Sequence, residues 1–377
     1  MEIYLDNSAT TKVCEAAAKK AYDVMLFNYG NPSSLHSLGF SAEKIITEAR
    51  RAVASVIKSE ANEIYFTSGG TESNNTAIFG AVKAKKRLGN KIVTTAIEHP
   101  SVLECMKELE KEGFEVVYLK PDSSGNISKA QVLSAIDGRT VLVSMMSVNN
   151  ETGAIMPLDI VAPAIKKANS PALFHIDNVQ GFGKINLNAK KLSCDLMSIS
   201  GHKLHAPKGI GALYINTKAH ILPHHFGGGQ EKGIRPGTEP VPLIAAFSEA
   251  VKELPETMKE YKRLYEINML LREKLREIPG VTINSPENNL PYILNFSTMQ
   301  VRGETMLHYL ESKNIYVSTG SACSKAKPSH VLSGMGLSNK HIETSLRASF
   351  SRNTTKEEVL LLAEEIRNGL SSLAHIK

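Results

Sequence analysis

The chain has 377 residues with ordinary hydrophobic and charged fractions of 42% and 22%, which is enough for a large core and more than one domain. The net charge of +6 is spread over Lys and Arg beside Glu, without a basic tract interleaved with aromatic residues, so nucleic-acid binding is not expected. No apolar run reaches the roughly 18 residues of a membrane span, and no signal peptide opens the chain. We therefore expect a cytoplasmic protein.

The first residues form a short extended piece at 3–5. A helix at about 15–27, a loop at 28–38 and a helix at about 41–56 follow. Apolar runs then alternate with helical stretches: strands at 63–67, 91–97, 115–119, 140–146, 172–176, 195–199 and 211–215, with helices at 73–87, 101–112, 128–136 and 158–168. This alternation predicts an α/β fold with a mainly parallel seven-stranded sheet covered by helices on both faces.

A helix near 242–252 and a long charged helix at about 256–277 lead into a smaller α/β unit. Its expected strands lie near 280–284, 292–296 and 315–317, and its expected helices near 303–313, 339–342 and 355–374. We predict a large domain at residues 15–255 and a small domain formed by residues 1–14 and 256–377.

Two segments carry charged groups at the end of a predicted strand. Residues 195–203 (DLMSISGHK) are an apolar run that stops at small and polar residues and delivers Lys203. Residues 172–180 (ALFHIDNVQ) are a strand that ends on Asp177, where ligands of open α/β sheets bind. An amine and a carboxylate are thus predicted at one edge of the sheet.

Two further segments add a phosphate site and an aromatic ring. Residues 63–75 read as a strand, a glycine turn and the polar start of a helix, whose unpaired N–H groups suit a phosphate. His99 follows the apolar run 91–97. Together with Lys203 and Asp177, this set fits pyridoxal phosphate better than a nucleotide, and neither Gly-x-x-x-x-Gly-Lys-Ser/Thr nor Gly-x-Gly-x-x-Gly is present.

Several motifs in the same order resemble the cysteine desulfurases of the NifS and IscS type, which are pyridoxal-phosphate enzymes of the class-V aminotransferase family. They are residues 5–11 (LDNSATT), 30–34 (GNPSS), 148–153 (VNNETG), 200–203 (SGHK) and 321–324 (SACS), with the segment at Thr71. The match extends from about residue 3 to about residue 370. It implies the type I fold of PLP-dependent transferases and a homodimer.

The resemblance assigns roles around the cofactor. Lys203 would form the Schiff base, Asp177 would pair with the pyridine nitrogen, Gln180 would contact the ring hydroxyl, and His99 would stack on the ring and shuttle protons. The phosphate and the remaining cofactor contacts would be made by Gly70, Thr71, Asn150, Ser200, His202 and, in the partner subunit's site, Thr238.

The resemblance also places the substrate. Arg347 would bind the α-carboxylate of L-cysteine, with help from Asn150. Cys323, in a small-residue loop with Lys325 and Lys327, would attack the substrate sulfur. The products would be L-alanine and a persulfide on Cys323, which passes to an acceptor for iron–sulfur cluster, thio-cofactor or tRNA biosynthesis.

Some alternatives stay open at this level. The segment between Cys323 and Pro328 is about two residues shorter than in most relatives with the long catalytic loop, which leaves the acceptor undefined. Selenocysteine lyase or another class-V aminotransferase-type activity uses the same scaffold. The four cysteines form no Cys-x-x-Cys pair, and the histidines at 220, 224 and 225 match no catalytic spacing, so we expect no metal.

Overall fold

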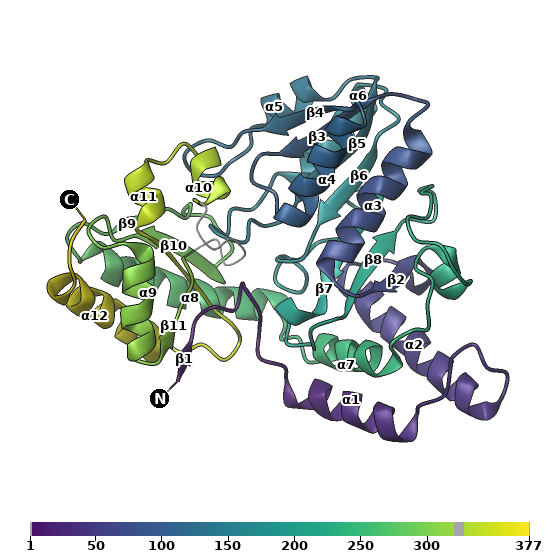
Figure 1. Cartoon of the computed structure of the whole chain (residues 1–377), viewed down its shortest axis with the longest axis horizontal. Helices are drawn as coiled ribbons and strands as arrows, with labels where there is room; N and C mark the ends of the chain where they lie inside the picture. The colour runs from purple at the N-terminus through teal and green to yellow at the C-terminus, as the bar shows by residue number, and fades with distance from the viewer. Residues whose placement is uncertain (1, 320–327, 377) are drawn as a thin grey trace.

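The computed structural model describes residues 2–319 and 328–376 (Figure 1). A seven-stranded sheet of order β2-β8-β7-β6-β5-β3-β4 forms the larger part of the molecule. Its strands are β2 (Ile64–Thr67), β3 (Lys91–Thr95), β4 (Glu115–Leu119), β5 (Thr140–Met146), β6 (Leu173–Asp177), β7 (Leu196–Ser200) and β8 (Gly211–Ile215). Only β8 runs against its neighbours, so the predicted mainly parallel α/β sheet is confirmed.

Helices cover both faces of this sheet. One face is covered by α2 (Ser37–Val56), α5 (Lys129–Ala135), α6 (Val161–Lys167) and α7 (Val241–Lys252), and the other by α3 (Gly70–Lys85) and α4 (Pro100–Lys111). Helix α1 (Glu15–Phe27) packs on α7. Side chains alternate between the faces, because Phe174 and Ile176 enter the first core while Leu173 enters the second. Both strand faces are therefore apolar, which explains the continuous apolar runs.

Two helices begin earlier than predicted. The expected loop at 28–38 ends at Ser37, where α2 starts, because the His36 ring accepts a hydrogen bond from the Gly39 N–H group and caps the helix. The first turn of α2 leaves Leu38 and Phe40 exposed, so it carries no amphipathic signal. Similarly, α3 starts at Gly70 instead of residue 73.

The smaller unit has its own apolar core. Strand β10 (Ile293–Ser297) lies between β9 (Thr282–Ile283) and β12 (Ser345–Ser349), all antiparallel. The helices of this unit are α8 (Thr257–Arg276), α9 (Gly303–Ser312) and α12 (Lys356–Ser372). Strand β12, which carries Arg347, was not expected from the sequence.

The two chain ends meet in this unit. Strand β1 (Ile3–Tyr4) pairs in parallel with β11 (Ile315–Tyr316), and Ile3 and Leu5 join the small core. The short helix α10 (His330–Gly334) follows the smaller unit in the chain but packs on the larger one, because Val331 and Leu332 lie in the core of the large sheet. The helix predicted near residues 339–342 is present as α11 (Asn339–Glu343). The division at residues 15–255 stays a prediction.

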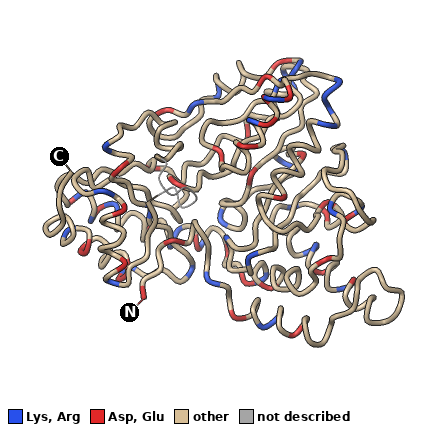
Figure 2. The backbone as a smooth tube through the Cα atoms, viewed as in Figure 1, with Lys and Arg blue, Asp and Glu red and all other residues tan. Residues whose placement is uncertain are grey.

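Charged side chains are distributed over the whole molecule. Figure 2 shows Lys and Arg interspersed with Asp and Glu along the tube, as the sequence indicated. Within the described residues, no helix combines the length and apolar character that crossing a membrane requires.

Candidate active site

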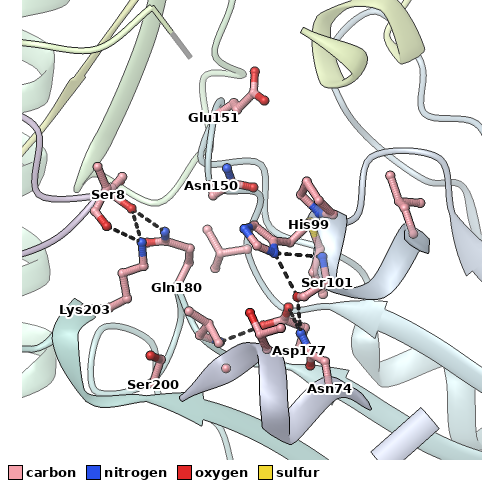
Figure 3. Close-up of a pocket in the computed structure, with 18 of the residues that line it drawn as sticks. Ser8, Asn74, His99, Ser101, Asn150, Glu151, Asp177, Gln180, Ser200 and Lys203 are labelled. Carbon is pink, nitrogen blue, oxygen red and sulfur yellow. Dashed lines mark hydrogen bonds between the residues drawn. The ribbon is translucent and has the colours of Figure 1, made fainter. Parts of the chain in front are cut away.

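The carboxyl edge of the large sheet brings the predicted segments together (Figure 3). Strand β6 ends at Asp177, and β7 ends at Ser200 before a short 3-10 turn that carries Lys203. His99 stands just after β3 as the N-cap of α4, and Asn150 lies beyond the end of β5. Because these parallel strands point the same way, their ends form one polar rim.

A glycine turn connects β2 to α3 at this rim. Gly69 has a φ of 152°, which a residue with a side chain rarely adopts. At Gly70 an added Cβ would lie 2.7 Å from Cγ2 of Val179 and 3.6 Å from Cβ of Ser200. The first turn of α3 therefore approaches the ends of β6 and β7 closely, and its N–H groups face the space beside Ser200.

Asp177 and His99 are connected by a chain of hydrogen bonds that sequence reasoning missed. Asn74 Nδ2 donates to Asp177 Oδ2 at 2.8 Å and also lies 2.8 Å from Ser101 Oγ. The Ser101 N–H group donates to His99 Nδ1, and Ser101 Oγ is 2.8 Å from the same atom. Nδ1 is thus an acceptor, which leaves Nε2 to carry the proton of the neutral ring. The other carboxylate oxygen of Asp177, Oδ1, accepts a hydrogen bond from the Val179 N–H group at 3.0 Å.

The N-terminal segment supplies the partners of Lys203. Lys203 Nζ donates hydrogen bonds to the carbonyl oxygen of Ser8 and, at 2.8 Å, to that of Ala9. Gln180 Nε2 donates to the same Ser8 oxygen at 3.0 Å. The motif at residues 5–11 therefore lies against the lysine, and its main-chain oxygens define where the amine rests.

Arg347 is buried at the boundary of the two units. Its Nη2 is 2.8 Å from Asp6 Oδ1, and its Nη1 donates to the carbonyl oxygen of Asn150 at 2.9 Å. Only 2% of the residue is exposed, and Nε has no hydrogen-bond partner among the described residues. A buried guanidinium with an open donor is suited to a carboxylate ligand.

A cavity of about 620 Å³ connects these groups, which is the size of a small-molecule site. Its wall includes these predicted residues: Gly70, Thr71, His99, Asn150, Asp177, Gln180, Ser200, His202, Lys203 and Arg347. It also includes residues that we did not predict: Ser8, Ala9, Asn74, Ser101, Glu151 and His330. Asn74 was visible in the motif at 63–75, whereas nothing in the sequence pointed to Ser101.

The polar groups of this wall fit pyridoxal phosphate. Gln180 Oε1 and Asn74 Oδ1 are buried acceptors without partners among the described residues, so they remain open to a ligand. Asp177 presents a carboxylate, the α3 N-terminus presents N–H groups, and Lys203 presents an amine within the same cavity. This donor and acceptor set matches a pyridinium nitrogen, a ring hydroxyl, a phosphate and an aldehyde.

Burial favours the neutral form of two of the histidines in the wall, His99 and His202. Burial lowers the pKa of His99, a shift that the charge of Asp177 opposes and that of Lys203 reinforces. Burial, with the charge of Lys203, lowers the pKa of His202 to about 4. Thr10 Oγ1 lies 3.2 Å from His202 Nδ1. Both rings are therefore neutral near pH 7, and His99 can donate a hydrogen bond or its proton from Nε2.

One predicted residue stands away from the cavity, and another lies outside the described residues. Cys323 lies outside the described residues, so the structure does not place it. Thr238 is exposed and does not line the cavity. The other cysteines are not candidates for nucleophiles, because burial raises the thiol pKa of Cys14, of Cys105 to about 12, and of Cys194. No group of His, Cys, Asp or Glu suited to a metal occurs among the described residues.

Comparison with known proteins gives consistent matches. The family model for class-V aminotransferases matches residues 3–362. The cysteine desulfurase IscS of Vibrio vulnificus is 39% identical over 99% of this chain and 94% of its own length. A solved NifS-like protein superposes with a TM-score of 0.93 at 36% identity, covering 99% of this chain and all of the other. SspA in complex with cysteine gives a TM-score of 0.82 at 32% identity over 93% and 99% of the two chains.

Proposed function

The chain belongs to the class-V aminotransferase family and, within it, to the NifS and IscS type. From that premise we propose that it is a pyridoxal-phosphate-dependent cysteine desulfurase, which converts L-cysteine to L-alanine and transfers the sulfur to Cys323. The observation that carries the proposal is the single cavity in which Lys203, Asp177 and the open Nε of Arg347 converge. An amine, a carboxylate and a carboxylate-binding guanidinium are what an amino-acid substrate and this cofactor require.

The residues that would hold the cofactor come from the ends of β2, β6 and β7. The α3 N-terminus with Thr71, Ser200 and His202 would bind the phosphate, and Gln180 Oε1 would accept the ring hydroxyl proton. Asp177, with both oxygens already held by N–H donors, would keep the pyridine nitrogen protonated. When bound, pyridoxal phosphate supplies an electron sink for the α-carbon of the substrate.

Residues of this chain would handle the substrate and the protons. Arg347 would orient the α-carboxylate, with Asp6 and Asn150 holding two of its nitrogens in place. Lys203, released from the Ser8 and Ala9 carbonyl oxygens, would take the α-proton, and His99 Nε2 lies at the rim to hold or deliver a proton.

The sulfur transfer requires a thiolate at Cys323. This thiolate attacks the substrate sulfur, the carbon–sulfur bond breaks, and its electron pair returns to the carbon side, which becomes alanine after protonation. The new sulfur–sulfur bond is the persulfide. The acceptor of this sulfur, such as an iron–sulfur scaffold or a thiolation enzyme, stays a prediction, as does the cytoplasmic location.

We propose further that two copies of the chain form the enzyme. Large apolar side chains are exposed along α1, the segment that leads into α2 and the first turn of α2: Tyr22, Met25, Phe27, Tyr29, Leu35 and Phe40. A second copy covering this face would remove that apolar surface from water. Thr238, exposed outside its own cavity, would then reach the phosphate of the partner. Sedimentation of wild type and Phe27→Asp tests this, because a monomeric wild type contradicts it.

The experiment that tests the function is release of sulfide and alanine from L-cysteine with a reductant present. We compare wild type, Cys323→Ala and, as a matched control, Cys14→Ala. The Cys323 variant should keep the cofactor absorbance and lose sulfide release, while the control keeps both. Full activity in Cys323→Ala would overturn the assigned nucleophile, and no activity in a wild type that binds the cofactor would overturn the substrate.

A further inference from the structure

Glu98 is a fully buried carboxyl group directly behind the cavity wall. None of its surface is exposed. Oε1 accepts hydrogen bonds from Thr95 Oγ1 at 2.7 Å and from the Met146 N–H group at 2.9 Å. Oε2 has no partner among the described residues. The side chain thus joins the end of β3 to the end of β5, one residue before His99.

A second carboxylate stands on the adjoining strand. Met146, which donates to Glu98, is the register partner of Asp177 in the ladder between β5 and β6. Both Asp177 oxygens accept N–H groups, and the residue faces the cavity. Two neighbouring buried carboxyl groups do not both ionise at low cost, and the one with better hydrogen bonding loses its proton first.

Ionised Glu98 would leave Oε2 as a charged, unpartnered oxygen inside the protein, which is far more costly than a neutral hydroxyl. We propose that Glu98 is held in its neutral, protonated form as a positioning residue that ties β3 to β5 behind His99 and leaves Asp177 as the ionised carboxylate of the site. The proposal rests on the roles given above to Asp177 and His99. It adds the reason why only one of two buried carboxyl groups carries charge.

The electrostatics agrees with this geometry. Burial, with the charge of Asp177, raises the pKa of Glu98 to about 8, against the two hydrogen bonds that lower it. Among the described residues, further ionisable groups close to it are His99, next in the chain, and His330 on α10, whose Nε2 donates to the Glu98 carbonyl oxygen at 2.9 Å. Neither β3 nor β5 brings an ionisable side chain to its carboxyl group, because their contributing residues are Thr95 and Met146.

A stability measurement on the protein without cofactor tests the proton directly. Because the folded pKa lies above the usual value of 4.5, the stability that protonated Glu98 contributes is complete below about pH 4.5 and is lost as pH rises toward 8. Glu98→Gln keeps an acceptor for Thr95 and Met146 without a titration. The unfolding midpoint of Glu98→Gln relative to wild type should therefore rise between pH 5 and pH 8.

The control for this measurement is Glu112→Gln at the exposed end of α4, which should show no such change. Infrared spectra of wild type near pH 6.5 should contain a protonated-carboxyl band that Glu98→Gln lacks. A pH-independent difference in midpoint, with no such band, would overturn the proposal. Neither readout needs activity, so failure of the proposed function and failure of this inference are separable.

Activity gives the positioning readout. At pH 7, Glu98→Gln should keep kcat/KM for L-cysteine within about threefold, whereas Glu98→Ala should lose roughly 100-fold through misplacement of His99. Above pH 8 the wild type should lose activity more steeply than Glu98→Gln, because only the wild type acquires a second charge beside Asp177. Equal damage in both variants would contradict a neutral role for Glu98.

Discussion

Two buried arginines of the smaller unit differ in how completely their guanidinium groups are hydrogen-bonded. Arg272 on α8 is 1% exposed, and its nitrogens donate to Asn268 Oδ1 at 2.8 Å, the Pro286 oxygen at 2.6 Å and Asn289 Oδ1 at 3.1 Å. Arg347 is 2% exposed, yet its Nε finds no partner within the part of the chain that the structure describes. The first guanidinium is satisfied by its own chain and holds the fold, whereas the second keeps a donor open for a ligand.

A third buried cation differs from both. Lys184 is 8% exposed, and within the described residues its ammonium group interacts with the ring of Tyr292, whose centroid is 5.4 Å from Nζ, and with no carboxylate. It lines a second, small cavity that Lys203 also lines. Burial lowers the pKa of Lys184 to about 8. The three residues thus form a series from saturated to nearly unpaired, and each can be perturbed separately.

The largest effect is expected at the saturated arginine. Arg272→Met should lower the free energy of unfolding by about 3–5 kcal/mol, because it removes the donor from several buried oxygens. Urea unfolding measures this. Arg276→Met on the same helix, where the side chain is 52% exposed, should change it by less than about 0.5 kcal/mol. Similar small losses in both variants would remove the distinction between the two kinds of arginine.

Replacing Lys184 should change the free energy of unfolding in the opposite direction. The folded pKa of Lys184 lies below its ordinary value of 10.5, so the cost of burying its charge is complete below pH 8 and disappears as pH rises through 10.5. Lys184→Met should therefore raise the free energy of unfolding at pH 7 by about 2–3 kcal/mol, and less at pH 10. Thermal unfolding checks this, with Lys166→Met on the surface of α6 as control. A destabilised Lys184→Met would reveal an anion or water partner.

The half-satisfied arginine should affect the substrate more than the fold. Arg347→Lys keeps the positive charge but loses the planar fork, so KM for L-cysteine should rise by about 10- to 100-fold, with a smaller change in kcat. Steady-state kinetics and circular dichroism of the same samples separate binding from folding. An unchanged KM would mean that the open Nε does not meet the carboxylate.

The smallest effect on stability and ligand binding is expected at Gln180, whose neutral amide oxygen has no partner among the described residues. Gln180→Met removes the unpartnered Oε1, so the protein without cofactor should keep its stability within about 1 kcal/mol. The dissociation constant for pyridoxal phosphate should rise by about 3- to 10-fold, since one ligand hydrogen bond is lost. Equilibrium dialysis measures it. A less stable protein with unchanged affinity would assign Gln180 to the fold, through its bond to Ser8.

Much of the fold and part of the site could be predicted from local patterns. The seven strands of the large sheet were recognised from their apolar runs, which are buried throughout in all of them except β2 and β4. Asp177 and Ser200 were placed because such runs end abruptly at polar residues. Strand β12 was missed because its sequence SLRAS mixes polar and apolar residues although all of them are buried. The start of α2 was missed because a histidine ring caps it.

The order of polar residues along the chain was sufficient to indicate the family, the cofactor and the sheet edge at which Lys203 and Asp177 lie. The partners of those groups were decided only by the tertiary structure. Asn74 on α3 reaches Ser101 on α4, Ser8 approaches Lys203 from the N-terminal segment, and Glu98 binds the strand next to that of Asp177. The reason is physical: whether a buried polar atom is satisfied, charged or open depends on which distant segment ends beside it.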